Sequence, residues 1–473
     1  MSFLKIKISN IIEIEEPTPE IFAYCENQLK FKNPDYEKKK RMGFWIGNMS
    51  KELKLYNYYQ GKIYLPIGCF DDLYTMYPDS KLYEDYSVTI PIKIESNIKL
   101  RIYQEPCLKA LEKYVNGLFV LPAGTGKTQC ALQCFAKLQQ KCCWITHTKD
   151  LMNQAKERCE QNMTCKTSCI TDGKCDTSGD IVFCTVQTLR NFVEKQEISQ
   201  NEFGLLIIDE CHRLCTSAES TMMFEECLNY FASRYKLGLT ATLHRADGLE
   251  KCIPKLLGNV LYEVKKENDK LVGYYENKKV CEVPLIDFQV PIQVNIINTE
   301  YNIIDRDVYN KDGMTLSFSK LITDIGNNKK RNKIIIDIAN SLNTPTLILS
   351  DRVDQLKYLQ ENIPNSIQVD GKTKKSVREK ALEDMKNGKY KVLLASYQLA
   401  REGLDIIRLE NLIMATPVKD FAVVIQSCGR IQRPYGNKKI AKVYDLVDDV
   451  SFLNRFYSKR KSIYKKENWE VVK

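Results

Sequence analysis

Two series of short apolar segments alternate with amphipathic segments along most of the chain. Such segments are long enough for a buried strand and too short for a helix of the core. Their alternation with helical segments indicates parallel sheets that are covered by helices. The sequence therefore predicts two parallel-sheet lobes. We expect strands at residues 118–121, 143–146, 180–185, 205–209 and 237–242 of the first lobe, and at 346–350, 366–370, 391–396, 411–416 and 441–446 of the second.

The length of 473 residues exceeds that of one ordinary domain and suggests about three compact units. We expect a small α+β domain over residues 1–95, which are rich in tyrosine and carry no chemical motif. The two α/β lobes are expected over residues 96–263 and 331–455. The charged, asparagine-rich segment 264–330 is expected to link them, and residues 456–473 to form a basic tail.

The composition is that of a globular protein, with 44% hydrophobic and 27% charged residues. No stretch approaches the ~18 apolar residues of a membrane span, and the N-terminus lacks the apolar core of a secretory signal. The formal net charge is +10, and residues 1–100 hold 14 basic and 14 acidic side chains, so the excess lies beyond them. This distribution favours a polyanionic partner; the alternative is a solvated surface.

The chain contains 18 cysteines, which is a high number. A secreted disulfide scaffold is usually much shorter, so we expect reduced thiols in an intracellular compartment. Cys159, Cys165, Cys169 and Cys175 form a cluster without the C-x2-C spacing of a structural zinc site, and a metal there is the minor interpretation.

The segment LPAGTGKT (121–128) follows one predicted strand and precedes a segment whose apolar positions trace one helical face. This order is typical of a phosphate-binding loop, although leucine replaces the first glycine of the full motif. Gly124 and Gly126 would let backbone N–H groups point at phosphate oxygens. Lys127 would reach the β and γ phosphates, and Thr128 would ligate Mg²⁺. The alternative is a fortuitous glycine-rich turn.

A second chemical segment is LLIIDECH (205–212), in which two acids follow a buried strand. Ligand sites of parallel sheets lie at this end of the strands. Asp209 fits the carboxylate that organises Mg²⁺, and Glu210 fits the base that orients or deprotonates an attacking water. Two surface acids without a catalytic role are the alternative.

The third segment, VVIQSCGRIQR (423–433), lies in the second lobe. Gln426, Arg430 and Arg433 are spaced i, i+4 and i+7, so a helix places them on one face. Arginines presented in this way can neutralise the charge that develops on a γ-phosphate. A solvated helix face is the alternative.

These segments, with others, resemble the motifs of the superfamily 2 nucleic-acid helicases, the DEAD/DEAH-like group. The resemblance covers roughly residues 98–455 and implies two RecA-like lobes with a cleft between them, where ATP is hydrolysed with Mg²⁺. The matching segments are LRIYQ (100–104), PAGTGKT (122–128), THTKDLMNQ (146–154), TVQTL (185–189), DECH (209–212), TAT (240–242), LILSDRVDQL (347–356), ASYQLAREGLDI (395–406) and QSCGRIQR (426–433).

Within the superfamily, GLTATLHRADG (238–248) is similar to the DNA helicases of the xeroderma pigmentosum group B type and to their phage and large-virus relatives. That branch often carries Arg-Glu-Asp where this chain has Arg245-Ala246-Asp247. The resemblance implies a nucleic-acid partner, with DNA favoured over RNA.

The resemblance also implies roles for individual residues. Catalysis is expected from Lys127, Asp209, Glu210, Gln426, Arg430 and Arg433. The nucleotide is expected to contact Arg101, Gln104, Ala123, Gly124, Thr125, Gly126, Lys127, Thr128, Gly403 and Asp405. His212, Thr240 and Thr242 would couple the ATP site to the nucleic acid. The strand itself would contact Thr148, Thr185, Thr188, Ser350 and Ser396. A structural role is expected for His147 and His244.

The expected function is thus an ATP-dependent DNA helicase or translocase. The alternatives are an RNA helicase or transcript-release motor, and an ATP-gated nucleic-acid clamp that does not unwind. We expect a monomeric motor without a membrane partner, in which residues 1–95 recruit nucleic acid or protein. The lysine-, asparagine- and isoleucine-rich composition fits a viral source. The basic runs KKKR (38–41) and KRK (459–461) fit solvated charge better than nuclear-import signals.

Overall fold

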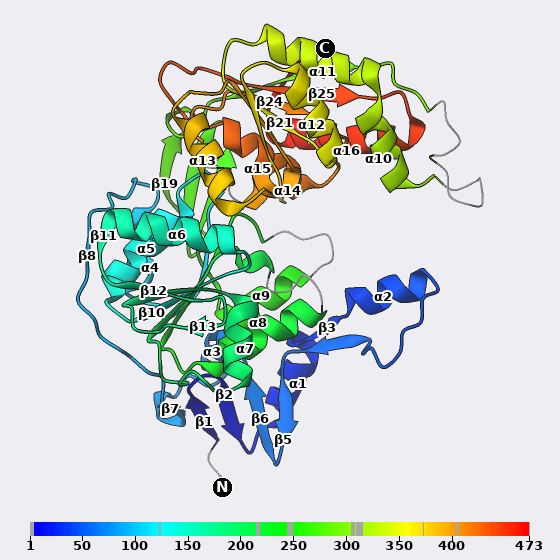
Figure 1. Ribbon diagram of the computed structural model, residues 1–473. Coiled ribbons are helices and arrows are strands. Elements are labelled where there is room, and N and C mark those ends of the chain that lie inside the picture. Colours follow the sequence, from blue (N-terminus) through cyan, green and yellow to red (C-terminus); the bar gives the residue numbers. More distant parts are fainter. Residues whose placement is uncertain are drawn as a thin grey trace. The chain divides into compact units, whose positions relative to one another are not determined.

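The computed structural model describes residues 4–472 apart from 123, 214–217, 244–248, 304–307, 309–315, 372, 403 and 405. The chain divides into two compact units, Met1–Val283 and Pro284–Lys473 (Figure 1). Each unit is built on one large parallel sheet, and the first carries a smaller sheet as well. Among the described residues, no helix is both long and apolar enough to cross a membrane.

The first unit begins with a five-stranded sheet in which only β1 and β7 pair in parallel. Burial alternates along the central strands, so Ile6, Ile14 and Ile63 enter the core while their charged neighbours face outward. In sheet order the strands are β5 (Asn57–Tyr59), β6 (Lys62–Leu65), β2 (Ile12–Glu15), β1 (Lys5–Ile8) and β7 (Tyr83–Asp85).

A ten-stranded sheet follows, and its strands from β12 to β17 run parallel. Its central strands are buried on both faces, which explains why they read as continuous apolar runs. The strands in sheet order are β13 (Lys174–Cys175), β12 (Thr167–Thr171), β14 (Ile181–Thr185), β10 (Cys142–Thr146), β15 (Leu205–Ile208), β16 (Tyr235–Thr240), β9 (Asn116–Val120), β17 (Val260–Glu267), β18 (Lys270–Tyr275) and β19 (Lys278–Pro284).

Helices cover both faces of this sheet (Figure 1). One face packs against α7 (Val186–Glu194), α8 (Ala218–Tyr230) and α9 (Cys252–Leu257), and the other against α4 (Glu105–Ala110), α5 (Lys127–Leu138) and α6 (Lys149–Asn162). The small sheet carries α1 (Pro19–Gln28), α2 (Pro34–Arg41) and α3 (Phe70–Met76). Two short antiparallel pairs complete the unit: β3 (Lys30–Lys32) with β4 (Glu52–Lys54), and β8 (Glu95–Ser96) with β11 (Met163–Thr164).

The small sheet and the large sheet share one hydrophobic core. Lys236 of β16 is fully buried, and its amino group donates to the carbonyl oxygens of Asn10 at 3.0 Å and Leu228 at 2.7 Å. Lys255 and Asp72 form an ion pair between α9 and α3 at 2.5 Å. The N-terminal α+β domain is therefore packed onto the first lobe as part of one unit.

The second unit has a seven-stranded sheet in which every neighbouring pair is parallel. Its strands in sheet order are β22 (Ser366–Val369), β23 (Val392–Ala395), β21 (Thr346–Leu349), β24 (Asn411–Met414), β25 (Ala441–Val447), β20 (Ile292–Asn298) and β26 (Glu470–Val472). One face packs against α13 (Lys375–Lys386), α14 (Tyr397–Glu402), α15 (Phe421–Ile431) and α16 (Ser451–Lys466), and the other against α11 (Lys329–Ser341) and α12 (Val353–Asn362), with α10 (Phe318–Asn327) preceding them.

The predicted fold class is confirmed: each of the ten predicted strands is a strand of one of the two large sheets. The limits of the units differ from the expected ones in two places. Residues 264–298, expected in the linker, supply strands to both large sheets, namely β17 to β19 and β20. The expected basic tail 456–473 includes most of α16 and the strand β26. Charge and asparagine content hid these elements, because strands with one exposed face and surface helices tolerate polar residues.

Candidate active site

The loop after β9 has the geometry of a phosphate cradle. Gly124 and Gly126 both have φ of +81°, in the left-handed region, and Gly126 is the N-cap of α5. A β-carbon on Gly126 would lie 2.6 Å from the Gln104 side chain, so only glycine fits this position. The first turn of α5 leaves its N–H groups directed to the loop, where they favour an anion.

The segment before α4 is hydrogen-bonded to this loop. The Gln104 amide donates to the carbonyl of Thr125 at 2.7 Å, and the Tyr103 hydroxyl donates to the same oxygen at 2.9 Å. The Gln104 side-chain oxygen accepts from the backbone N–H of Arg101 at 2.9 Å, and the Arg101 guanidinium donates to Tyr103. The predicted nucleotide contacts Arg101 and Gln104 therefore lie beside the phosphate loop, and the buried Tyr103, which the sequence did not indicate, lies with them.

A polar chain runs from the loop to the end of β16. The Lys127 ammonium lies 3.4 Å from one carboxylate oxygen of Glu210, and Nδ1 of His212 lies 3.2 Å from the other. The same His212 nitrogen is 3.1 Å from the Thr240 hydroxyl, which donates to the carbonyl of Thr242 at 2.8 Å. The structure thus brings together residues from the ends of β15 and β16 and the start of α5.

The two adjacent acids differ in pKa. Burial, and then the neighbouring Glu210 carboxylate, raise the pKa of Asp209 to about 7. Burial acts in the same direction on Glu210, but the Lys127 ammonium and the hydrogen bond from His212 outweigh it and hold the pKa of Glu210 below its ordinary value. His147, expected to be structural, contributes to this lowering. Glu210 is therefore the ionised member, as a base requires.

Arg158 of α6 is a member of the site that the sequence did not indicate. Its guanidinium donates to the Thr128 hydroxyl at 3.1 Å and interacts with Asp209, although burial lowers its own pKa. Helical spacing could have identified it, because Arg158 lies one turn beyond Gln154, the last residue of the segment THTKDLMNQ. An arginine between two predicted magnesium ligands stabilises the charge of Asp209 there.

The residues fit a nucleoside triphosphate with Mg²⁺. The cradle of loop N–H groups and the Lys127 ammonium suit phosphates, and Asp209 with Thr128 offers the oxygen ligands that Mg²⁺ prefers. Burial raises the pKa of Asp209, and a divalent cation held there would favour its ionised form.

In the second unit, α15 carries the predicted arginine segment. Arg430 donates from Nε to the carbonyl of Ala400 at 2.8 Å and from Nη1 to that of Leu404 at 3.0 Å. Gln426 lies one turn earlier, with a buried side-chain oxygen, and Arg433 follows the end of the helix. Arg430 is thus bonded to α14 and to Leu404. The predicted nucleotide contacts Gly403 and Asp405 lie outside the described part, as do Ala123, His244 and Arg245 to Asp247.

Four of the five predicted strand contacts lie at helix starts that follow parallel strands. The Thr148, Thr185 and Ser396 hydroxyls accept from the backbone N–H three residues later, and the Thr188 hydroxyl lies 2.9 Å from that of Thr185. Ser350 differs: it is fully buried and its hydroxyl donates to Gln355 at 2.7 Å. Its hydrogen bonds stay within the second unit.

Among the described residues, no group of three or more histidine, cysteine or acidic side chains is placed to hold a metal ion. Within the cysteine cluster, the sulfur atoms of Cys159 and Cys165 lie 3.5 Å apart, Cys159 is buried and Cys175 is exposed.

Both large sheets match known domain families. Residues 97–245 match the Type III restriction enzyme, res subunit family, and residues 329–435 match the helicase conserved C-terminal domain. A putative ATP-dependent RNA helicase, L396, of Acanthamoeba polyphaga mimivirus is 27% identical over 385 residues, which cover 79% of this chain and 68% of that protein. The DNA 3'-5' translocase XPB2 of Sulfurisphaera tokodaii is 28% identical over 377 residues, which cover 73% and 81%.

Among solved structures, Dbp5 of S. cerevisiae bound to RNA and ADP BeF3 has the same fold, with a TM-score of 0.57 at 14% identity over 79% of this chain and 90% of that one. The fold and the two domain families define a two-lobed helicase. The chain belongs to the superfamily 2 helicases and is related to the XPB-type translocases and to viral helicases. It is an ATP-dependent helicase.

Proposed function

We propose that the chain is an ATP-driven motor that moves along nucleic acid, with DNA as the favoured substrate. The observation that carries the proposal is the chain of contacts Lys127–Glu210–His212–Thr240, because it joins a phosphate loop to the segment that follows β16. The net charge of +10 supports a nucleic-acid partner, and the similarity to a DNA translocase supports the choice of DNA.

The chemistry follows from the charges of the site. Lys127 neutralises the β and γ phosphates, and Glu210, which stays ionised, accepts the proton of the attacking water or orients it. Asp209 and Thr128 would hold Mg²⁺, which would supply positive charge to neutralise the phosphates. Gln426, Arg430 and Arg433 complete the site from the second lobe, as the resemblance implies. Gly403 and Asp405 contact the nucleotide beside them.

The contacts Lys127–Glu210–His212–Thr240 also provide a route that couples ATP hydrolysis to nucleic-acid binding. When a γ-phosphate binds the Lys127 ammonium, Glu210 loses its cationic partner. The contact between Glu210 and His212 must then change. His212 shares a hydrogen bond with Thr240, whose carbonyl accepts from Leu121 of the phosphate loop at 2.9 Å. The lobes grip the strand through phosphate contacts, expected at Thr148, Thr185, Thr188, Ser350 and Ser396. We propose a monomeric motor in a reducing, intracellular compartment.

The deciding experiment measures ATP turnover with single-stranded DNA, duplex DNA, branched DNA and RNA side by side, with Lys127→Ala as the inactive control. We expect the strongest stimulation by a DNA substrate and loss of turnover in Lys127→Ala. Equal turnover with and without every nucleic acid would contradict the motor, and turnover that persists in Lys127→Ala would contradict the assigned site.

An RNA motor is the second candidate, because the mimivirus relative carries the name of a putative RNA helicase. Stimulation by RNA above that by all three DNA substrates would favour it. Tight ATP-dependent binding without strand separation or directional movement would instead indicate a clamp.

A further inference from the structure

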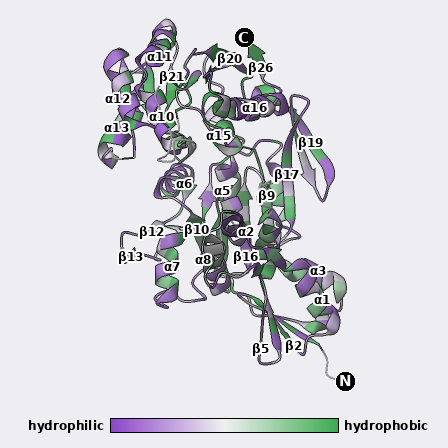
Figure 2. Ribbon diagram, turned by 90° about the vertical axis from the view of Figure 1, so that its right-hand side faces the viewer, coloured by the Kyte–Doolittle hydropathy of each residue, from purple (hydrophilic) through white to green (hydrophobic). Residues whose placement is uncertain are grey.

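One segment of the N-terminal domain is unlike the rest of it in charge. Residues 30–54, the arm, comprise β3, α2, the tip 42–49 and β4. The arm holds eight basic and three acidic side chains, whereas residues 1–100 hold 14 of each. The remainder of the domain is therefore acidic, and its cations are concentrated on the arm. Lys38, Lys40 and Arg41 are exposed at the C-terminal end of α2, which Figure 2 draws in the hydrophilic colours.

The base of the arm is fixed by paired backbone. β3 and β4 pair antiparallel, with Phe31 opposite Leu53. Asn33 is buried and closes the loop: its backbone N–H donates to Lys51, its amide donates to Ser50, and its side-chain oxygen caps α2. The arm is thus a defined element that projects from the small sheet (Figure 1).

The tip is ordered by the end of α2. Gly43 has φ of +68°; its N–H donates to Lys40, and the N–H of Phe44 donates to Lys39. This pair of bonds is a Schellman motif, in which the residue after the glycine usually packs on an apolar residue of the last turn. That residue is Lys39 here, so the Phe44 side chain stays 62% exposed.

Trp45 is the most exposed large apolar side chain among the described residues, at 88%. Its ring lies over Gly47, where a β-carbon would come within 2.8 Å of it. Met42 is exposed as well, so the tip presents aromatic and thioether groups directly after the cations of α2 in the sequence. Cations at a helix C-terminus compensate the helix dipole, which accounts for the lysines but not for two open aromatic rings.

We propose that the arm binds an unpaired nucleic-acid strand, with phosphates on Lys38, Lys40 and Arg41 and a base stacked on Trp45. Unpaired strands are bound in this way by cationic surfaces with aromatic rings, because every base has a stacking face and every linkage a charge. A duplex hides its base faces, and a protein partner fits the lysines of the arm less well, because lysine is depleted in protein–protein interfaces. DNA and RNA offer the same phosphates and bases. The proposal deepens the proposed function by giving it a contact outside the two lobes.

The test is equilibrium binding of labelled 20-residue oligothymidylate and oligouridylate to the full chain without ATP. Of the three tryptophans, Trp144 is buried and Trp469 is partly buried, so Trp45 should dominate quenching of tryptophan fluorescence by the strand. We expect quenching that Trp45→Phe reduces, and affinity that Trp45→Ala lowers about tenfold, since one stacked base contributes about 1–3 kcal/mol.

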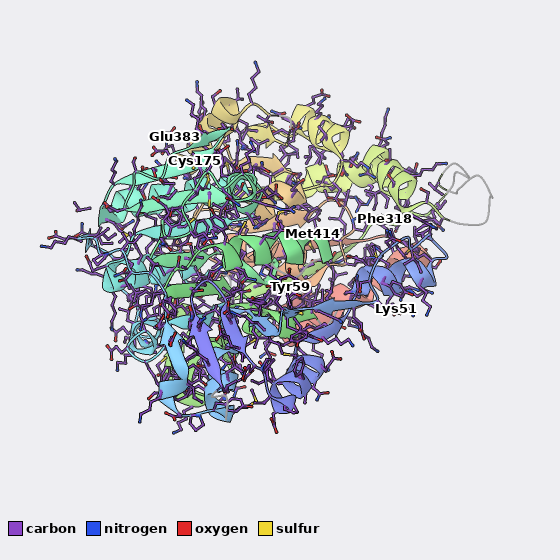
Figure 3. All side chains as sticks on the ribbon, turned by 90° about the horizontal axis from the view of Figure 1, so that it is seen from below. Lys51, Tyr59, Cys175, Phe318, Glu383 and Met414 are labelled. Carbon is purple, nitrogen blue, oxygen red and sulfur yellow. The ribbon has the colours of Figure 1, made fainter. Side chains whose placement is uncertain are left out.

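Replacing Lys38, Lys40 and Arg41 by Gln should reduce the slope of log K against log salt by about 2, at about 0.7 for each phosphate on a single strand. The matched controls are Tyr59→Ala, an exposed aromatic on β5, and Gln at Lys81, Lys93 and Lys278, three exposed lysines of the same unit. Neither the Tyr59 control nor the triple-lysine control should change the quenching or the salt slope. Figure 3 labels Tyr59 on the small sheet and Lys51 at the base of the arm.

ATP turnover without nucleic acid should be unchanged in every arm variant, so a failed motor and a failed arm give different results. Quenching and affinity that survive Trp45→Ala would overturn the proposal. Equal quenching by polyglutamate of the same charge would also overturn it, because that polymer lacks bases. Preference for oligothymidylate or for oligouridylate identifies the strand as DNA or RNA.

Discussion

Glu210 combines an unusual backbone with a central position in the site. Its φ of +53° lies in the left-handed region, which non-glycine residues rarely adopt. This conformation costs roughly 1–3 kcal/mol and is found where a site holds a residue in place. Here it accompanies the contacts of the carboxylate with Lys127 and His212. The contacts with Lys127 and His212 therefore stabilise a backbone conformation of Glu210 that the local sequence would not favour.

Replacing Glu210 by Gln should separate binding from hydrolysis. The amide keeps the size of the side chain but cannot accept a proton from water, so turnover should fall about 10²–10⁴-fold. ATP binding should persist, because Lys127 remains and gains freedom to contact phosphate. Stopped-flow dissociation from single strands in the presence of ATP should be slower than for the native chain. An off-rate that is not slowed would show that Glu210 has another role.

Lys236 should make stability depend on pH. Burial lowers its pKa to about 7, and a neutral amine has the two N–H donors that the Asn10 and Leu228 carbonyls accept. The unfolded chain keeps the lysine protonated up to about pH 10.5. Between these values the unfolded state binds more protons, so the free energy of unfolding should rise with pH, by up to about 1.4 kcal/mol per unit.

Urea denaturation of the native chain and of Lys236→Met at pH 7.5 and 8.5 measures this term. The free energy of unfolding of the native chain, relative to that of Lys236→Met, should be higher at pH 8.5 than at pH 7.5. An exposed control, Lys81→Met, should show no such change. A difference between the two free energies that is independent of pH would mean that Lys236 keeps its proton in the folded state.

At the scale of elements, α16 shows how a basic segment can be structural. Leu453, Phe456 and Ile463 are buried on one of its faces, and Arg460 is 2% exposed. The Arg460 guanidinium binds both carboxylate oxygens of Asp445 on β25, at 2.9 Å and 2.8 Å. The run KRK (459–461) is therefore a solvated pair of lysines around a buried arginine.

Removing one partner of this buried pair should destabilise the second unit. Arg460→Ala leaves the Asp445 carboxylate buried with only the Tyr464 hydroxyl at 2.7 Å, and should cost about 3–5 kcal/mol of unfolding free energy. Urea denaturation monitors the loss, with the exposed neighbour Lys459→Ala as the control. A double replacement, Arg460→Met with Asp445→Leu, should recover much of the stability. A single variant as stable as the control would contradict the role of the pair.

At the scale of the whole molecule, the proposed hydrolysis needs both units. Lys127 and Glu210 lie in the first, whereas Arg430 and Arg433 lie in the second. Arg430 also bonds to the carbonyls of Ala400 and Leu404, so its loss would disturb the loop as well as the charge. Arg433 follows the end of α15, and its replacement tests the second unit.

Arg433→Ala should reduce nucleic-acid-stimulated ATP turnover by about 10³-fold, the effect of an arginine on phosphoryl transfer, with a smaller change in nucleotide affinity. Steady-state ATPase assays and equilibrium binding of a nucleotide analogue measure the two quantities. Lys439→Ala, an exposed lysine nearby in sequence, is the control. Turnover equal to that of the control would leave the second unit without a role in the chemistry.

The central strands of both large sheets were predictable, because a strand that is buried on both faces is mainly apolar. A short apolar run in the sequence therefore indicates its position. β15 (Leu205–Ile208) and β21 (Thr346–Leu349) illustrate this rule. The phosphate loop was predictable for a related reason, since Gly126 must adopt a left-handed φ beside Gln104. The strands β17 to β20 were not predicted, because exposed and polar residues interrupt their apolar pattern.

By itself, the sequence determined the two parallel sheets, the phosphate loop and the acids that follow β15, because these features depend on local patterns of apolar and glycine residues. Only the tertiary structure decided which distant groups share a charge or a hydrogen bond: Arg158 with Thr128, Lys236 with Asn10, and Arg460 with Asp445. A buried cation looks the same in a sequence as a solvated one. Its partner lies far along the chain, and folding alone brings the two together.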